Sequence, residues 1–314
     1  MVYETALLIH SPVKKVLRKS GAISTALWTH VRDMAVGRGG IMKVSRVAGA
    51  LGAEVTGIDV SASLADGSLG VIRDLLNEHE VLFFRDQCIA PSEQRDMARL
   101  FGPLQTHPAY GTVDGLPEVM LLESTEAKPS KIEIWHSDMT FRQHPPSVTV
   151  LKGVTIPPVG GDTLFASMTA AYDGLSAGMK AYLEPLVAVH DFSQGFKESL
   201  SEPGGRERLA EALSDNPPVR HKVIQTHPET GKRVIFVNAL FTSHIEDISP
   251  LESSGVLNFL YQHCVLPEYT CRFKWAVDSL VLWDNRSTQH KPINDFLPAS
   301  RALHRVVSEG DLPY

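Results

Sequence analysis

Runs of β-branched and aromatic residues recur along this chain from Met42 onward, and short polar stretches containing Gly and Pro separate them. Apolar runs of this length, bounded by turn residues, are typical of strands. We expect strands within residues 54–60, 80–86, 147–156, 162–167, 186–192, 233–238, 279–285 and 302–310. The stretch 42–60 also predicts a strand, a turn and a second strand. Many short strands indicate a sandwich or a barrel.

Apolar residues at helical spacing predict helices within 68–79, 91–102, 168–186 and 253–264. These helices do not alternate regularly with the strands, which disfavours a doubly wound parallel sheet. We therefore expect a mainly β protein with flanking helices, built on a double-stranded β-helix, or jelly roll. The polar stretch 192–221, rich in Gly and Pro, predicts an insertion between strands that can act as a lid.

Residues 1–41 differ in charge from the rest of the chain. The basic residues there outnumber the two acids, Glu4 and Asp33; they are Lys14, Lys15, Arg18, Lys19, Arg32 and Arg38. A targeting peptide and an appended helix are both alternatives, although the segment lacks a continuous apolar region. We expect a poorly ordered basic extension over 1–41 and a single domain over 42–314.

Composition narrows the classes of function. The chain has 314 residues, 43% hydrophobic and 21% charged, with a formal net charge of -6, which is typical of a globular protein and argues against a nucleic-acid partner. No apolar run approaches the ~20 residues of a membrane helix. The odd number of cysteines, with no Cys-x-x-Cys pair, disfavours a disulfide framework and favours the cytoplasm.

Candidate metal ligands occur in "WHSDMTF", where one residue separates His136 from Asp138. On a strand these two side chains would share a face. His290, which follows the apolar run 279–285, is the best third ligand. Two imidazoles and one carboxylate form a facial triad that suits non-haem Fe(II). A lone His-x-Asp pair also occurs by chance, and the same ligands could hold catalytic Zn(II) in a hydrolase.

Further polar residues follow at suggestive distances. Thr163 comes 27 residues after His136, and Arg301 and Arg305 come 11 and 15 residues after His290. Arginines four apart on a strand point the same way. Their planar guanidinium groups match a carboxylate or a sulfonate in bidentate geometry.

In these motifs the chain resembles the taurine dioxygenase (TauD/TfdA) family of Fe(II)- and 2-oxoglutarate-dependent dioxygenases. The likeness runs from about Met42 to Asp311, and it is carried by "GAEVTGIDV", "VLFFRDQ", "WHSDMTF", "PPVGGDTLF", "THPETGKRVIFVN" and "WDNRSTQHKPINDFLPASRALHRVV". The resemblance implies Fe(II) as the metal and 2-oxoglutarate and O₂ as co-substrates. It also implies that His136, Asp138 and His290 bind the iron, and that Thr163 and Arg301 hold 2-oxoglutarate.

The resemblance implies a substrate site as well. Arg305 would meet an anionic group of a small organic substrate. Further positions that match the family's substrate site are His107, Tyr110, Met139, Phe196 and Phe241. For Phe196 and Phe241 plain core packing is an equal alternative, and for His107 a role in a turn is the alternative.

One position departs from the family's pattern. Taurine-specific members carry an asparagine four residues before the first metal histidine, where this chain has Ile132. The expected reaction is hydroxylation of a sulfonate such as taurine, giving an aldehyde, sulfite, succinate and CO₂. Ile132 leaves an alkyl sulfate ester or an aryloxyalkanoate as alternative substrates. A silent jelly-roll binding protein is a further alternative, and the family implies a homo-oligomer, a dimer or a tetramer.

Overall fold

The computed structural model describes residues 31–36, 40–61, 69–107 and 110–311. Strands β1 (Val31–Val36) and β2 (Gly40–Arg46) pair in antiparallel register. The poorly ordered extension that we expected up to residue 41 is therefore wrong for this part, since β1 and the start of β2 extend the edge of a sheet. The same expectation for residues 1–30 lies outside the described residues.

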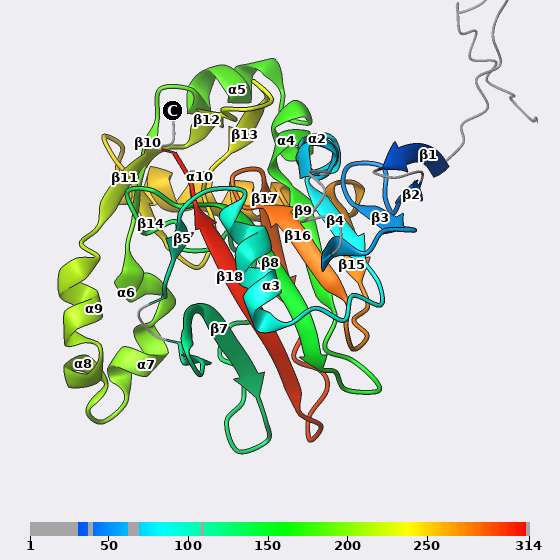
Figure 1. Cartoon of the computed structure of the whole chain (residues 1–314). Coiled ribbons are helices and arrows are strands. Elements are labelled where there is room, and N and C mark those ends of the chain that lie inside the picture. The colour runs from blue at the N-terminus through cyan, green and yellow to red at the C-terminus, as the bar shows by residue number, and fades with distance from the viewer. Residues whose placement is uncertain (1–30, 37–39, 62–68, 108–109, 312–314) are drawn as a thin grey trace, which may run out of the picture. The chain divides into compact units, whose positions relative to one another are not determined.

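The larger sheet contains β1 and β2 together with β3 (Ala53–Thr56), β4 (Val81–Phe84), β16 (Leu280–Asp284), β8 (Pro146–Thr155), β18 (Arg301–Glu309), β7 (Leu116–Ser124) and β6 (Thr112–Val113), in that spatial order (Figure 1). Strand β5 (Leu104–Gln105) also pairs with β18. The pairs in this sheet are antiparallel except β3 with β4. The mainly β class is confirmed, and the strands expected from the apolar runs are present.

Smaller sheets form a second layer. One has the order β15 (Thr270–Phe273), β9 (Thr163–Ser167) and β17 (Thr288–Pro292), and another β11 (Val219–Lys222), β10 (Val187–His190) and β14 (Thr242–Ile245). Strands β12 (Ile224–Thr226) and β13 (Arg233–Ile235) form a hairpin. Phe165 on β9 packs with Phe83 and Trp283 of the larger sheet, so the two layers share one core.

Burial on both faces explains why the central strands are apolar throughout. On β4, Val81 and Phe83 face the second layer, while Leu82 and Phe84 join the core beneath the helices α2 (Leu69–His79) and α3 (Pro91–Arg99). Alternate side chains of a strand point to opposite faces, so a strand covered on both sides needs apolar residues at every position.

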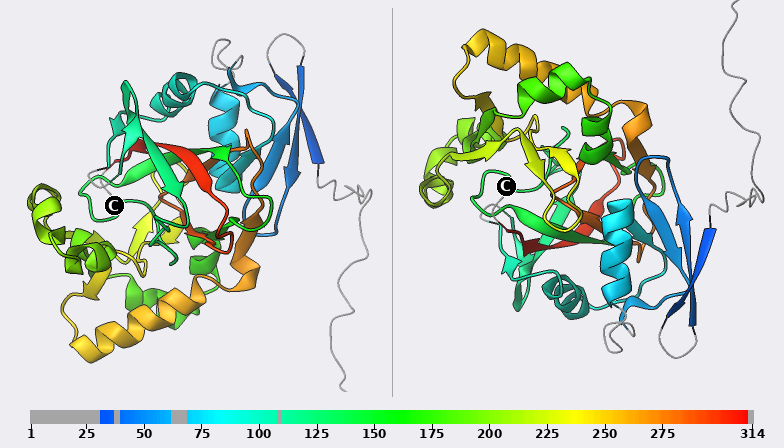
Figure 2. Two further views of the ribbon diagram at one scale, coloured as in Figure 1. Left: turned by 90° about the horizontal axis from the view of Figure 1, so that it is seen from below. Right: turned by 90° about the horizontal axis from the view of Figure 1, so that it is seen from above.

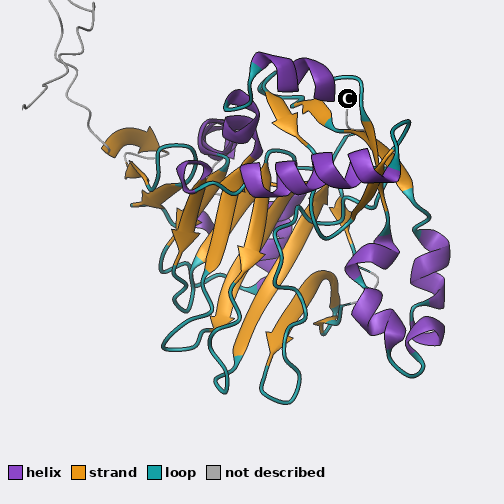
Figure 3. Cartoon of the chain, turned by 180° about the vertical axis from the view of Figure 1, so that it is seen from behind, coloured by secondary structure: helices purple, strands orange, loops and turns teal. Residues whose placement is uncertain are grey.

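Helices α4 (Met168–Asp173), α5 (Ala177–Leu183) and α10 (Pro250–His263) cover the outer side of the smaller sheets (Figure 3). The helix expected over 168–186 is split into α4 and α5, because Ser176 caps α5 in an extended conformation. Helix α10 begins at a capping box in which Ser249 and Glu252 satisfy each other's backbone N–H groups. A short 3₁₀ helix, η1 (Pro267–Tyr269), follows the end of α10.

The expected insertion 192–221 forms short helices followed by β11. They are α6 (Phe192–Gly195), α7 (Lys197–Ser201), α8 (Gly205–Arg208) and α9 (Ala210–Asp215). Figure 2 shows these helices on the side of the sheets opposite β1–β3. Lys131 forms an ion pair with Glu198 on α7 and another with Glu202, which ties the helices to the segment that precedes His136.

Candidate active site

His136, Asp138 and His290 lie together between the two layers. All are buried, and one potential ligand atom from each lies within 4.8 Å of the others. The Nε2 atom of His136 is 3.8 Å from Oδ1 of Asp138, and the ring centroids of the two histidines are 4.2 Å apart. The three side chains thus form one compact cluster.

Backbone hydrogen bonds fix the two histidines relative to each other. His136 forms an isolated antiparallel bridge with His290 of β17. The N–H of His136 donates to the carbonyl of His290 at 3.0 Å, and the N–H of His290 donates back at 2.7 Å. The two imidazoles therefore start from directly opposed backbone positions.

Asp138 is placed by a turn. We expected His136 and Asp138 on one strand, but residues 138–141 form a turn, and Met139 has φ of +46°. Such a φ is uncommon for a residue other than glycine. The side chain of Asn285 holds the turn: its Oδ1 accepts from the N–H of Asp138 at 2.7 Å, and its Nδ2 donates to the carbonyl of Asp138 at 2.9 Å. This amide, rather than strand alternation, directs Asp138 toward the histidines.

Burial and charge set the protonation of the cluster. Burial lowers the pKa of His290 to about 3, so its imidazole is neutral at pH 7. Burial alone would raise the pKa of Asp138, but the opposing effect of its neighbours, that of the Arg305 guanidinium above all, lowers that pKa to about 2. His136 places Nδ1 2.9 Å from the carbonyl of Ile134, an arrangement that leaves Nε2 as the acceptor. Neutral imidazoles and an ionised carboxylate are the forms that bind metals.

Thr163 and Arg301 lie beside this cluster. Thr163 opens β9 opposite Pro292, two residues from His290, and Nη2 of Arg301 is 3.3 Å from its Oγ1. Burial lowers the pKa of Arg301 to about 10, and its Nε has no partner among the described residues. The charge of Asp162 opposes this lowering of the pKa only in part, and Arg301 forms no ion pair within the described part of the chain, so its guanidinium can bind a carboxylate from a ligand.

Trp275 belongs to the same group, although the sequence did not indicate it. Its Nε1 donates to Oγ1 of Thr163 at 2.9 Å, and its side chain is buried. The residue lies in the loop between β15 and β16. In the sequence, a tryptophan next to a predicted strand indicates only a core residue. Its distance from Thr163 along the chain does not suggest that the two side chains meet.

Arg305 contacts the cluster of His136, Asp138 and His290 through Asp138. Along β18 it follows Arg301 by four residues, so the two side chains leave the same face of the strand from Cα atoms about 13 Å apart. Its Nη1 is 2.8 Å from Oδ1 of Asp138, and its guanidinium lies 5.2 Å from the ring centroid of Tyr110. Its Nε has no partner among the described residues.

The expected substrate residues lie close to one another, and Arg305 contacts one of them, Tyr110. One aromatic cluster contains Tyr110, Ile132, Met139, Phe141, Phe192, Phe196 and Phe241. His107 adjoins it, with its ring centroid 4.5 Å from Tyr110 and 5.9 Å from Phe196. The ring centroid of Phe241 lies 6.4 Å from that of His136. Burial, and then the charge of Arg305, lowers the pKa of His107 well below its ordinary value.

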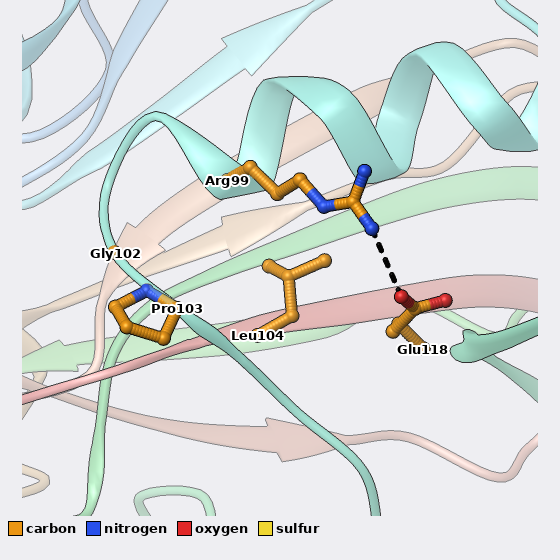
Figure 4. A pocket seen from close by; sticks show the side chains of 5 residues that line it. All are labelled: Arg99, Gly102, Pro103, Leu104 and Glu118. Atoms are coloured by element: carbon orange, nitrogen blue, oxygen red, sulfur yellow. Dashed lines mark hydrogen bonds and ion pairs between the residues drawn. The ribbon is translucent and has the colours of Figure 1, made fainter.

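A shallow hollow at the end of α3 does not belong to this site (Figure 4). Its lining consists of Arg99, Gly102, Pro103, Leu104 and Glu118. The charges of Arg99 and Glu118 pair with each other at 3.0 Å. The hollow therefore offers no unpaired charge for a ligand.

Comparisons with known proteins agree with this geometry. Residues 43–307 match the family described as "Taurine catabolism dioxygenase TauD, TfdA family". The chain belongs to the TauD/TfdA family. An alkylsulfatase of Acinetobacter baylyi is 35% identical, over 86% of each chain. A putative alpha-ketoglutarate-dependent sulfonate dioxygenase of Schizosaccharomyces pombe is 33% identical, over 87% of this chain and 71% of its own.

The solved structure of a taurine dioxygenase from Burkholderia xenovorans has a TM-score of 0.74 and 33% identity, and the match covers 87% of this chain and 92% of that one. The jelly-roll core is thereby confirmed. As a TauD/TfdA member the protein is an Fe(II)- and 2-oxoglutarate-dependent dioxygenase, and O₂ is its second co-substrate. No helix of the described residues is long and apolar enough to cross a membrane.

The residues present fit the iron of the TauD/TfdA enzymes. The cluster combines two neutral imidazoles with one carboxylate, the ligand set of a facial triad. Nδ1 of His290 is buried and has no hydrogen-bonding partner among the described residues. A buried imidazole nitrogen without a partner is costly unless something such as a metal ion satisfies it.

Proposed function

We propose that this dioxygenase hydroxylates a small organic sulfate ester or sulfonate with an apolar carbon chain. The observation that carries the proposal is the surroundings of Arg305, a buried guanidinium that faces the aromatic cluster. A planar cation suits a sulfate or sulfonate head group. Ile132 and Phe196 of the cluster suit a hydrocarbon chain better than the charged amine of taurine.

Fe(II) is held by His136, Asp138 and His290. When bound, Fe(II) together with 2-oxoglutarate and O₂ supplies the oxidising power that inserts oxygen into a substrate C–H bond, with release of succinate and CO₂. The share of the protein is to keep the imidazoles neutral and the carboxylate ionised, and to exclude water. Phe241 beside His136 contributes to that exclusion.

Arg301 and Thr163 bind the far carboxylate of 2-oxoglutarate. Arg305 binds the anionic head of the substrate, and His107 and Tyr110 flank it. These positions set the substrate carbon next to the head group near the metal cluster. Hydroxylation of that carbon makes the C–O or C–S bond unstable, so a sulfate ester yields an aldehyde and sulfate, and a sulfonate yields an aldehyde and sulfite.

The experiment compares substrates that differ in one feature. Purified protein loaded with Fe(II) is given 2-oxoglutarate and O₂ with hexyl sulfate, hexanesulfonate, taurine or a phenoxyacetate, and succinate, sulfate, sulfite and phenol are measured separately. We expect succinate in step with sulfate or sulfite, and higher kcat/KM for the hexyl compounds than for taurine. If taurine were the best substrate, the proposed preference for an apolar carbon chain would be wrong. Release of phenol would show that the substrate is an aryloxyalkanoate.

A zinc hydrolase could use the same three ligands, but membership of the TauD/TfdA family argues against it. It would release sulfate without consuming 2-oxoglutarate and would leave Thr163 and Arg301 unexplained. Mixing Fe(II) and 2-oxoglutarate with the protein under anaerobic conditions separates the two, because chelation of the iron by 2-oxoglutarate produces a new absorption band. A metal-dependent hydrolysis with no such band would favour zinc.

We also propose a cytoplasmic location and a homo-oligomer. All of the three cysteines are free, which suits a reducing compartment. Helix α10 and the loop after it leave Leu251, Phe259 and Leu266 exposed, and exposed apolar side chains of this kind support self-association. Light scattering after size-exclusion chromatography tests it, and a monomer at micromolar concentration would refute it.

A further inference from the structure

The hydroxyl of Thr163 has an unusual set of partners. It accepts a hydrogen bond from Nε1 of Trp275 at 2.9 Å and another from Nη2 of Arg301 at 3.3 Å. A hydroxyl has two acceptor lone pairs and one hydrogen to donate. Both lone pairs are therefore engaged, and the hydrogen must point elsewhere. Among the described residues none accepts it.

The indole of Trp275 has no other polar role. Its side chain is 4% exposed, packs edge-on against Phe273 at 5.0 Å, and lies 5.8 Å from the guanidinium of Arg301. The N–H is its one polar atom, and a buried tryptophan usually directs that group to a partner. Trp275 thus contacts both candidate 2-oxoglutarate residues: its N–H bonds to Thr163, and its ring lies beside the guanidinium of Arg301.

We propose that Trp275 is a positioning residue for 2-oxoglutarate, an inference that rests on the proposed roles of Thr163 and Arg301. By donating to Oγ1 of Thr163, the indole turns the hydroxyl from an acceptor into a donor aimed at the far carboxylate of the co-substrate. The carboxylate then receives hydrogen bonds from Thr163 and from Arg301 together. Without the indole N–H, the hydroxyl is free to rotate its hydrogen away, and part of this binding is lost.

The test measures the affinity for 2-oxoglutarate, by calorimetry on Mn(II)-loaded protein under anaerobic conditions. Trp275→Phe keeps an aromatic ring and removes the N–H, and we expect it to raise the Kd for 2-oxoglutarate about tenfold, or ~1.4 kcal/mol. Phe273→Leu disturbs the packing around Trp275 and keeps its N–H, so we expect a Kd within about twofold of wild type. The Kd for Mn(II) and the KM for the sulfur substrate should stay unchanged in both variants.

A double-mutant cycle tests whether Trp275 affects 2-oxoglutarate binding through the hydroxyl of Thr163. In Thr163→Val the hydroxyl is gone, so adding Trp275→Phe should weaken 2-oxoglutarate binding no further. If Trp275→Phe does not fold, Thr163→Val alone tests the same relationship, because losing the hydroxyl that the indole orients should raise the Kd for 2-oxoglutarate by about as much. Additive effects, an unchanged Kd in Trp275→Phe, or equal damage from Phe273→Leu would overturn the inference. Failure of the wild type to bind 2-oxoglutarate would instead refute the proposed function.

Discussion

Nη1 of Arg305 lies 2.8 Å from Oδ1 of Asp138, so the residue proposed to bind the substrate anion also contacts a proposed metal ligand. Both side chains are buried, and the pair accounts for the low pKa of Asp138 against the opposing effect of burial. On this proposal, Asp138 and the substrate anion bind the same guanidinium. A substitution of Arg305 should therefore be tested for its effect on metal affinity as well as on substrate affinity.

Arg305→Gln removes the positive charge and keeps part of the length of the side chain. We expect the KM for the anionic sulfur substrate to rise about ten- to a hundredfold, because one charge-assisted hydrogen bond contributes about 1.5–3 kcal/mol. The KM for 2-oxoglutarate should change far less. Titration with Mn(II) shows whether the substitution also weakens metal binding through Asp138. Equal increases in both KM values would assign Arg305 to 2-oxoglutarate instead.

Removing a metal ligand should end metal binding. Asp138→Ala leaves two imidazoles, which do not hold Fe(II) in place of the full triad, and we expect no stoichiometric Mn(II) binding and no succinate formation coupled to substrate. Glu133→Ala, an exposed carboxylate five residues earlier, is the matched control and should bind metal as wild type does. Full metal occupancy in Asp138→Ala would end the assignment of the triad.

Asn285 should affect metal affinity without contacting the metal. Its amide makes two hydrogen bonds to the backbone of Asp138 and a third, at 3.2 Å, to the carbonyl of Pro146. Partners that orient metal ligands typically change metal affinity 10–100-fold, so we expect Asn285→Ala to raise the Kd for Mn(II) by about that range. Asn258→Ala, at an exposed position of α10, is the control. A normal Kd in Asn285→Ala would show that the turn holds Asp138 by itself.

The fold could be predicted largely from apolar runs, because strands such as β4 and β16 are buried on both faces and carry no polar residue until they end. The ends of strands were less predictable. β3 ends at Thr56 although the apolar pattern continues to Val60, because Gly57 adopts a positive φ of 77°. A local pattern does not show where a turn of this kind interrupts a strand.

The candidate site was predictable where sequence spacing or family resemblance marks a residue, as for His136, His290 and Arg305. Asn285 and Trp275 were missed because they act across 147 and 112 residues of sequence, through hydrogen bonds that depend on the packed core. The turn at Asp138 was missed for the same reason: strand alternation offered a simpler explanation for His-x-Asp, while the actual geometry depends on the distant amide of Asn285.

Acid should destabilise the metal-free protein through buried histidines. His190 is fully buried, with Nδ1 2.9 Å from Oγ1 of Thr140 and its ring 5.2 Å from His221. Burial, and then His221, lowers the pKa of His190 well below its ordinary value of 6.5. The unfolded chain therefore binds a proton below pH ~6.5 that the folded protein does not, so stability is fully present above that pH and falls below it, by up to ~1.4 kcal/mol per pH unit.

The measurement is the free energy of unfolding in urea between pH 7 and 5, in the presence of a chelator. His190→Gln should be less stable at pH 7, because the buried network is disturbed, but its stability should fall less steeply with acid. His244→Gln, at an exposed position, should keep the wild-type slope. An unchanged slope in His190→Gln would show that His190 takes up its proton without unfolding.

Ile132 should help to select the substrate. Its partly buried side chain packs in the aromatic cluster with Phe196 and Phe241, and the amide of Asn294 donates to its carbonyl at 3.2 Å, so a substitution changes the side chain without freeing the backbone. Ile132→Asn places a hydrogen-bonding group on an apolar wall. We expect kcat/KM for hexyl sulfate to fall and the ratio of taurine to hexyl sulfate turnover to rise about tenfold, since one buried hydrogen bond contributes ~1 kcal/mol and the lost apolar contact adds to it. Ile134→Asn makes the same substitution at a position 42% exposed and should leave the ratio unchanged. If both variants behave alike, the preference for an apolar chain is set elsewhere in the cluster.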